Sequence, residues 1–461
     1  MHYIIFIMKS LFEHVLNIAV SLRNAGGRAL LAGGCVRDHL AGRKPQDFDL
    51  EVYGLPVQKI VSALNGRYAL DMVGASFGVM KVRHLDIDIA LPRSENKIGK
   101  GHRGFIVETA PDMDFASASS RRDFTVNAMM MDVLTGEIID PWGGQKDLEQ
   151  KILRHVSEHF SEDPLRVLRG MQFIARFDFT AAPETVELCR NISQDELPRE
   201  RLAAEWEKML LKGDHISRGL DFLSRCGWLK YYPELAALSG CSQDPRWHPE
   251  GDVWQHTLRV VDAASAINEK SADDKLILML AALTHDLGKP LCTVQEQDGR
   301  ITSCGHDTAL APAENFLRRL WNRPELIKMV TGLVRCHMQP WQLIRDGSSA
   351  RAYRRLALHV QRMDLLADLV ESDVRGIPAG EAVLAEKLRA VDVFRRRSDE
   401  LSVANAPPAP LVLGRHLLAR GIAPGKGMKP LLDTCFEAQL DGEFADFAGA
   451  MAFLDKLLCV K

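Results

Sequence analysis

The sequence lacks the features that mark membrane, secreted and fibrous proteins. Its nine cysteines are scattered with no Cys-x-x-Cys pair, which argues against a zinc ribbon or a disulfide framework and favours a reducing compartment. The apolar start, Tyr3–Met8, is too short to span a bilayer, and neither a basic segment nor a small-residue cleavage site accompanies it. Low-complexity tracts and internal repeats are also missing. We therefore expect a cytoplasmic globular protein with no membrane partner.

An excess of charge of either sign is lacking too, with 58 lysines and arginines against 61 aspartates and glutamates. Global charge thus gives no sign of a nucleic-acid binder, although a local basic patch is enough to bind phosphates. At 461 residues, of which 46% are hydrophobic and 26% charged, the chain is too long for one hydrophobic core. Two to four domains are expected.

The segment Leu31–Glu51, LAGGCVRDHLAGRKPQDFDLE, is the most informative part of the chain. Alternate side chains of an extended strand share one face, so Asp47 and Asp49 should point together while Phe48 and Leu50 enter a core. Two convergent carboxylates form a site of hard oxygen ligands that suits Mg²⁺, and this ion in turn suits phosphate substrates.

The glycine pair of the same segment points to phosphate binding. Gly33 and Gly34 have no side chains, so backbone N–H groups at a helix start can approach a triphosphate closely, and Arg37 follows them. Asp88, in DIDIALPR on a neighbouring expected strand, is a candidate third carboxylate. Asp86 would lie on the same face, and the sequence does not separate the two. Together these parts predict a nucleotidyl-transfer site.

Hydrophobic periodicity predicts an α+β chain with a small mixed-sheet head followed by helices. Helices are expected over 11–22 and 57–64, and strands over 30–32, 48–52, 78–82, 87–91 and within 128–140. After a turn at 141–144 the chain reads as almost wholly helical, with helices over 164–177, 182–191, 198–211 and 215–226 and a second block from 254 to about 397. An alanine–proline linker at 406–410 precedes a short helical tail.

Histidine and aspartate residues of the second helical block have the character of metal ligands. The motifs HPEGDVWQH, LAALTHDLGKP and ESDVRG place them on or beside expected helices. Imidazole and carboxylate groups bind divalent transition metals or Mg²⁺. The candidates are His256, His285, Asp286 and Asp373, with His306 and His337 for a second metal position. A degenerate helical domain without metal is the alternative.

Six motifs occur in order: GGCVRD, DFDLEV, DIALPRSE, RRDFTVNAM, DPWGGQKDLEQKILRHV and EDPLRVLRGMQFIARF. In this order they resemble the bacterial class II tRNA nucleotidyltransferases, the CCA-adding enzyme family, whose catalytic head is shared with the DNA polymerase β superfamily. The resemblance covers most of the chain, and six ordered motifs are far more specific than any one. It implies addition of CMP and AMP, from CTP and ATP, to the 3′ end of tRNA, with Mg²⁺ at Asp47 and Asp49.

The resemblance also assigns residues of RRDFTVNAM. It implies that Arg122 contacts the triphosphate, that Asp123 accepts from a ribose hydroxyl, and that Asn127 braces the loop. An exposed helix start with Asp123 as its N-cap is compatible with this interpretation.

In EDPLRVLR, Asp163, Arg166 and Arg169 are three residues apart and are expected on one helical face. The family uses this motif to select CTP and ATP without a nucleic-acid template. A surface ion pair of little energetic worth is the structural alternative. One departure stands out, because the family commonly has a further arginine where this chain has Gln172. Arg176 is a candidate to compensate.

The segment 94–113, with three glycines, reads as a flexible loop. In the family, a loop in this region helps to change the pocket from C to A addition, which favours a full CCA-adding or an A-adding enzyme. A connection without a role is the alternative.

The order His, His-Asp, Asp in the second helical block resembles the HD phosphohydrolase superfamily. Related CCA-adding enzymes with such a domain have phosphatase and 2′,3′-cyclic phosphodiesterase activities. We expect a nucleotidyltransferase head at 10–150, a helical neck and body at 151–240, an HD-type domain at 248–400 and a tail at 410–461. A bacterial poly(A) polymerase, or a phosphohydrolase or RNA-binding protein with a vestigial head, are the alternative functions.

Overall fold

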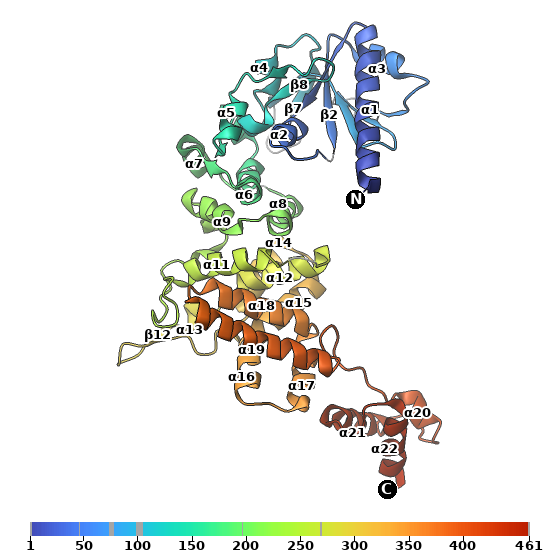
Figure 1. Ribbon diagram of the computed structural model, residues 1–461, viewed down its shortest axis with the longest axis vertical. Helices are drawn as coiled ribbons and strands as arrows, with labels where there is room; N and C mark the ends of the chain where they lie inside the picture. Colours follow the sequence, from blue (N-terminus) through green and yellow to red (C-terminus); the bar gives the residue numbers. More distant parts are fainter. Residues whose placement is uncertain are drawn as a thin grey trace. The chain divides into compact units, whose positions relative to one another are not determined.

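The computed structural model describes residues 2–45, 47–72, 78–97, 105–195, 197–267 and 270–459. The chain divides into two compact units, Met1–Met209 with Arg218–Trp228, and Leu210–Ser217 with Leu229–Lys461. The first unit contains a β-sheet and helices, and the second is almost entirely helical (Figure 1). The α+β class expected from the sequence is confirmed. None of the described helices combines the length and the apolar character that crossing a membrane requires.

The sheet of the first unit has seven strands in the order β3-β4-β5-β2-β1-β8-β9. The strands are β1 (Arg28–Ala32), β2 (Phe48–Tyr53), β3 (Leu70–Asp71), β4 (Val79–Val82), β5 (Ile87–Ala90), β8 (Met130–Asp132) and β9 (Ile138–Ile139). Strands β2 and β5 are parallel, and the other neighbouring pairs are antiparallel. The sheet is therefore mixed, as predicted.

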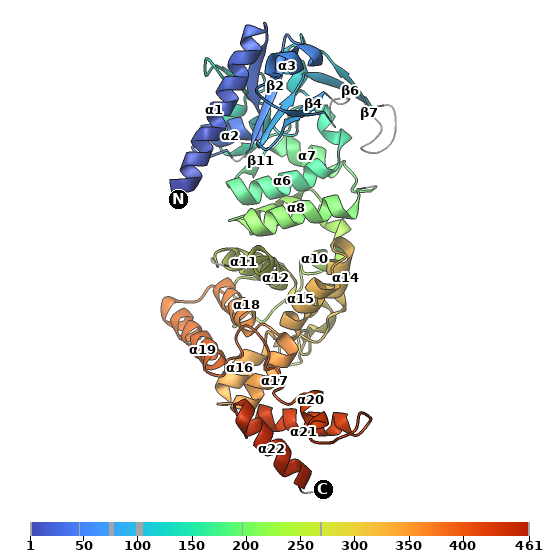
Figure 2. The same cartoon turned by 90° about the vertical axis from the view of Figure 1, so that its right-hand side faces the viewer.

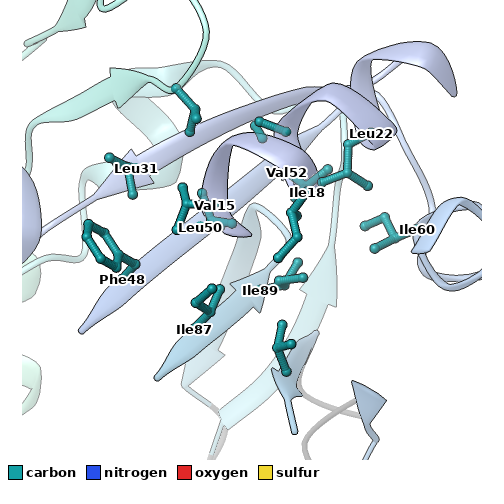
Figure 3. Close-up of a cluster of buried hydrophobic side chains, with 14 of the residues drawn as sticks. Val15, Ile18, Leu22, Leu31, Phe48, Leu50, Val52, Ile60, Ile87 and Ile89 are labelled. Carbon is teal, nitrogen blue, oxygen red and sulfur yellow. The ribbon is translucent and has the colours of Figure 1, made fainter. Parts of the chain in front are cut away.

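Helices α1 (His2–Asn24) and α3 (Val57–Leu64) cover one face of this sheet. Val15 and Ile18 of α1 pack with Leu50 of β2 and Ile89 of β5 in one buried cluster (Figure 3). Side chains alternate along β2, so the residues between the buried ones face the other way. The core thus turns Asp49 toward the opposite face of the sheet.

The segment expected as a loop over 94–113 contains a β-hairpin, so that expectation is wrong in part. Strands β6 (Arg93–Lys97) and β7 (Phe105–Thr109) pair antiparallel, with Arg93 opposite Thr109. The sequence FIVET of β7 is rich in residues that favour strands. The glycine-rich stretch 98–104, which carried the loop prediction, lies outside the described residues.

Four helices of the first unit and its border follow the predicted periodicity: α6 (Leu165–Phe177), α7 (Pro183–Arg190), α8 (Arg199–Lys212) and α9 (Ile216–Arg225). The short helices α2 (Gly34–Leu40), α4 (Phe115–Ser119) and α5 (Gly144–Glu149) lie outside the segments where periodicity predicted a helix. Buried aromatic rings join α6 to the motif RRDFTVNAM, because the Phe124 ring lies edge-on to Phe160 at 5.4 Å and to Phe173 at 5.7 Å. The two motifs therefore form one packed body.

The second unit is built on α11 (Val253–Ser265), α12 (Ala272–Thr284), α15 (Pro324–Cys336) and α18 (Met363–Gly376). Helix α11 packs against α12 and α18, and α12 packs against α15 (Figures 1 and 2). Around them lie α10 (Pro233–Ala236), α13 (Lys289–Cys292), α14 (Ala311–Leu320), α16 (Gln339–Arg345), α17 (Ala350–Val360) and α19 (Glu381–Glu400), followed by α20 (Gly414–Leu418), α21 (Met428–Asp441) and α22 (Phe447–Cys459). A short hairpin of β12 (Val294–Gln295) and β13 (Ile301–Thr302) interrupts the expected helical block.

Candidate active sites

Three carboxylates meet at the start of the parallel strands β2 and β5. The register of this pair places Asp49 directly opposite Asp88, and Asp47 stands immediately before β2. Asp86 also precedes its strand, and its carbonyl accepts from the N–H of Phe48. The pairing, which the sequence left open, thus favours Asp88 over Asp86 as the neighbour of Asp49.

The electrostatics of this acidic group suit a cation. Partial burial, with repulsion from Asp47 and Asp88, raises the pKa of the Asp49 carboxyl, while Arg122 and Lys81 act in the opposite direction. The Lys81 ammonium lies 3.3 Å from Asp88 Oδ2. Carboxylates that repel one another in this way fit a site for divalent cations, since a bound cation relieves the repulsion.

The glycine pair has a conformational role in this structure. Gly33 has a φ of 75°, in the left-handed region, and an added Cβ would lie 2.8 Å from Arg122 Nη1. Its N–H donates to the carbonyl of Met129 at 3.2 Å. Gly33 therefore gives space for Arg122 at the start of α2.

Arg37 is buried and holds neighbouring parts of the site together. Its guanidinium donates to Asn127 Oδ1 at 2.6 Å and to Asp38 Oδ1 at 2.7 and 2.9 Å. It also lies over the rings of Phe173 and Phe177, with its Cζ 5.1 and 4.4 Å from the ring centres. Arg37 thus connects α2 to Asn127 and to α6.

Arg122 is positioned by a residue that sequence reasoning missed, Glu51. Arg122 Nη2 donates to Glu51 Oε2 at 2.9 Å, and Tyr53 Oη donates to Glu51 Oε1 at 2.6 Å. Arg122 Nη1 also donates to the carbonyl of Asn127. The signal was present, because Glu51 follows Asp49 at the alternate position of DFDLE and shares its face.

Asp123 is buried and both of its carboxylate oxygens are engaged. Its Oδ2 accepts from Nε of Arg169 at 2.7 Å, and Nη2 of the same guanidinium lies at the same distance as an ion pair. Its Oδ1 accepts from Asn127 Nδ2 at 2.9 Å and from the N–H of Phe124 at 2.8 Å. Burial alone would raise the pKa of Asp123, but Arg169 and Asn127 hold it below its ordinary value. This geometry favours a positioning role over direct contact with a ribose.

The expectation that Asp163, Arg166 and Arg169 share a helical face is wrong for Asp163. Helix α6 begins at Leu165, and Asp163 precedes it in an extended conformation, as a residue before proline tends to do. Asp163 Oδ2 accepts from Arg201 at 2.9 Å. Arg166 donates to the carbonyls of His159 and Arg121 instead of pairing with Asp163.

Gln172, the departure from the family pattern, is buried in α6. Its Oε1 accepts from Arg176 Nη1 at 2.9 Å. Gln172 thus holds the guanidinium of Arg176, the residue that the sequence suggested could compensate for the missing arginine.

All six predicted metal ligands of the second unit lie in one cluster. They come from α11, the ends of α12 and α15, the segment after β13, and α18: His256, His285, Asp286, His306, His337 and Asp373. Their ligand atoms form two groups of three in which all atoms lie within 4.8 Å of one another, one of His256, His285 and Asp373, the other of Asp286, His306 and His337.

The four histidines of this cluster are oriented alike. Nδ1 of each is bonded to an oxygen that can only accept: Glu250 Oε1 for His256 at 2.8 Å, and the carbonyls of Ala282, Ser303 and Val334 for His285, His306 and His337 at 2.9, 2.7 and 2.7 Å. When such a ring is neutral, Nδ1 carries its proton and Nε2 can offer its lone pair to the centre. Although burial opposes it, the contacts with Asp373 and Glu250 raise the pKa of His256 to about 9, so a metal must displace a proton from this ring.

The centre of the cluster fits metal ions. Nε2 of His256 and Nε2 of His285 are buried and make no well-aligned hydrogen bond. Nε2 of His306 lies 3.3 Å from Nε2 of His337 and 3.4 Å from Asp286 Oδ1. Burial lowers the pKa of His337 to about 4, so this ring is neutral, as a metal ligand must be.

Three family models match the chain, each over a separate segment. They are the poly A polymerase head domain over residues 29–154, the probable RNA and SrmB-binding site of polymerase A over 178–238, and the HD domain over 253–369. The "Multifunctional CCA protein" of Acinetobacter baylyi is 36% identical over 358 residues, which span 75% of this chain and 83% of that protein. The chain belongs to the family of multifunctional CCA proteins. The Chromobacterium violaceum member is 39% identical over 63% of this chain and 69% of its own.

Solved structures share the fold of this multifunctional CCA protein family member. The CCA-adding enzyme of Bacillus stearothermophilus in complex with CTP has a TM-score of 0.63 at 22% identity, over 97% of this chain and 98% of its own. The Thermotoga maritima CCA-adding enzyme complexed with tRNA has a TM-score of 0.58 at 18% identity, over 97% and 95%. The head and the HD domain of this family imply metal ions, and the second unit contains His/Asp clusters that could hold them.

Glu250 is a second residue that sequence reasoning missed. Its side chain is buried, and Oε1 accepts from Nδ1 of both His248 and His256, at 2.9 and 2.8 Å. These contacts outweigh burial and lower the pKa of Glu250 to about 2, so the group is ionised. The motif HPEGDVWQH contained the signal, a carboxylate six residues before the candidate ligand.

Replacing Glu250 by alanine should weaken metal binding to the second unit by about 10- to 100-fold, because His256 loses the acceptor that fixes its tautomer. Glu250→Gln keeps an acceptor and loses the charge, so it should have the smaller effect. Titration with Co²⁺ followed by visible absorption measures both variants. Equal affinity for Co²⁺ in Glu250→Ala and the unchanged protein would contradict this role.

Gly288 lies so close to the backbone of His306, a candidate ligand, that a side chain at this position would collide with it. A Cβ at this position would lie 2.2 Å from the carbonyl oxygen of His306. Gly288→Ala should therefore displace His306 and reduce the metal content by one ion per chain, measured by elemental analysis. Gly380→Ala is the matched control, because its Cβ would meet nothing within 4 Å. An unchanged metal content in Gly288→Ala would show that His306 holds no metal.

Proposed function

We propose that this chain adds CMP and AMP from CTP and ATP to the 3′ end of tRNA and completes the CCA sequence without a template. The observation that carries the proposal is the meeting of Asp47, Asp49 and Asp88 beside the Arg122 guanidinium. In this reaction the RNA 3′-oxygen forms a bond to the α-phosphorus of the NTP. The bond between that phosphorus and the pyrophosphate oxygen breaks, and the hydroxyl proton is released.

We assign Mg²⁺ to the three carboxylates, since their oxygens are the ligands this ion prefers. Bound there, Mg²⁺ would activate the 3′-hydroxyl and stabilise the charge of the leaving pyrophosphate. Arg122, held in place by Glu51, would contact the triphosphate. Gly33 and Gly34 allow the NTP to approach the start of α2.

The other residues assigned from the sequence brace this site or select the base. Asp123 holds Arg169 and Asn127, and Arg37 holds Asn127 from the other side. We propose Asp163 and Arg166 as the groups that read the incoming base. Carbonyl contacts fix the plane of the Arg166 guanidinium, which pre-organises it for directed hydrogen bonds.

Four domains are proposed along the chain: the head at 10–150, the neck and body at 151–240, the HD-type domain at 248–400 and the tail at 410–461. The later helices would hold tRNA by its shape and phosphates. A tRNA substrate would place the enzyme in the cytoplasm.

The test uses tRNA transcripts that end before CCA, after the first C and after the second C, each incubated with CTP, ATP or both. We expect CTP to extend the first two transcripts to CC, and ATP to add one residue only after CC. Long tails with ATP alone would identify a poly(A) polymerase. Extension of the CC transcript only would identify an A-adding enzyme, and extension of none would overturn the proposal.

A second activity, metal-dependent hydrolysis of phosphate esters, is proposed for the HD-type domain. The convergence of four Nε2 atoms with Asp286 and Asp373 favours it. A divalent transition metal or Mg²⁺ bound there would supply an activated water as nucleophile. Lys289 lies 2.7 Å from Asp286 Oδ2 and donates to Gln243 Oε1 at 2.7 Å. It lines a cavity together with His285, His306, His337 and Asp373.

A further inference from the structure

An exposed tryptophan stands at the cavity that contains the histidine cluster. The Trp247 side chain is 68% exposed, which is unusual for so large an apolar group. The segment around it, between α10 and α11, is tightly folded. The N–H groups of Trp247 and His248 both donate to the carbonyl of Asp244, at 3.0 and 2.9 Å, and the Arg246 guanidinium pairs with the Asp244 carboxylate.

The same segment is attached to the metal-ligand cluster on both sides of Trp247. Four residues before it, Gln243 Oε1 accepts from Lys289, whose ammonium lies 2.7 Å from Asp286. Three residues after it, Glu250 accepts from His256. These contacts hold the backbone on both sides of Trp247 next to the cluster.

The side chains that line the cavity are of two kinds: the candidate ligands with the cations of Lys289 and Lys387, and the large apolar groups of Trp247, Trp341 and Met338. Its volume of about 790 Å³ lies within the roughly 300–1,000 Å³ typical of small-molecule sites. A ligand that suits both kinds of lining has a phosphate and a flat ring that can stack. A nucleoside phosphate has both groups, whereas the phosphate esters of aliphatic alcohols, of serine and of threonine lack the ring.

We propose that the indole of Trp247 is the platform on which the base of a nucleoside phosphate stacks while its phosphate lies at the histidine cluster. The inference rests on the proposed hydrolytic function of this cluster and specifies its substrate. Every base has a π-face, so stacking tolerates any of the four bases. The site would thus accept the terminal nucleotide of an RNA whatever its sequence. Trp247 is a specificity-determining residue in this proposal, distinct from the groups that act on the phosphate.

The test compares AMP with ribose 5-phosphate, which differ only by the base, as ligands of the full chain with Mg²⁺. Binding is followed by tryptophan fluorescence. The fluorescence of Trp247 is the difference between the signal of the unchanged protein and that of Trp247→Phe. We expect AMP, and not ribose 5-phosphate, to quench the fluorescence of Trp247. In Trp247→Ala, with Trp341 as reporter, the Kd of AMP should rise about 10- to 100-fold, whereas ribose 5-phosphate should compete as before. Trp247→Phe should keep most of the affinity.

Leu291→Ala is the matched control, because Leu291 is 70% exposed on the same unit and does not line the cavity. Equal affinity for AMP in Trp247→Ala and Leu291→Ala would overturn the platform, even if hydrolysis is intact. Absence of any AMP signal from Trp247 would overturn it as well. Quenching and selective loss of affinity in a protein without hydrolytic activity would support the platform and refute the hydrolase.

Discussion

Replacement of Asp49 by asparagine should slow the addition of nucleotides to tRNA by at least about 10³-fold. Asp49 lies opposite Asp88 and two residues from Asp47, so it is the central member of the acidic group. Asparagine keeps the size of the side chain and removes the negative charge that a divalent cation requires. A thousandfold loss corresponds to about 4 kcal/mol of transition-state stabilisation, in line with the several kcal/mol that such metals supply. Single-turnover extension of tRNA ending in CC with ATP measures the effect.

Asp86→Asn is the matched control for this experiment. Asp86 is an exposed carboxylate two residues before Asp88, and it contributes its backbone carbonyl to the sheet. We expect Asp86→Asn to retain most of the activity and Asp88→Asn to lose it. Hydrolysis of phosphate esters should be unchanged in Asp49→Asn, since the histidine cluster belongs to the other unit. Near-normal extension by Asp49→Asn would refute the assignment of the head.

In the head, the sequence predicts which side chains of a strand are buried, but it does not predict how the strands pair. The alternation in DFDLE correctly predicts that Phe48 and Leu50 are buried on the face opposite Asp49. The choice between Asp86 and Asp88 depends on the parallel register of β2 and β5, which joins segments about 40 residues apart. Periodicity carries no information about such a register, because either aspartate satisfies the same local pattern.

Helical spacing fails for a different reason at EDPLRVLR. A spacing of three residues predicts a shared face only inside a helix. Asp163 lies outside α6, which begins at Leu165, directly after Pro164. The partners of these side chains are then chosen by tertiary structure. Arg201 reaches Asp163, and Arg166 reaches the carbonyl of Arg121. Local sequence patterns did not identify Glu51 and Glu250 either, because these carboxylates act by orienting Arg122 and His256.

Replacement of Asp286 by asparagine is expected to abolish phosphate ester hydrolysis and to release the metal from the second unit. Asp286 belongs to the group with His306 and His337, and its Oδ2 also lies 3.2 Å from Nε2 of His285 in the other group. It therefore contacts both proposed metal positions. Although burial opposes it, the neighbouring His285 and Lys289 hold the pKa of Asp286 well below its ordinary value, so the group is charged. Elemental analysis measures the metal, and phosphate release measures the activity.

Stability complicates this variant, and a second one separates the effects. Asp286→Asn leaves the nearly buried ammonium of Lys289 without its counter-charge, which can cost roughly 3–5 kcal/mol of folding free energy. Asp286→Asn combined with Lys289→Met removes both charges and should fold better while still failing to bind metal. Extension of tRNA by this double variant should stay near normal, because Asp49 and its neighbours are intact. If the folded double variant still holds two metal ions, Asp286 is a structural partner of Lys289 and the ligands must be sought among the histidines and Asp373 alone.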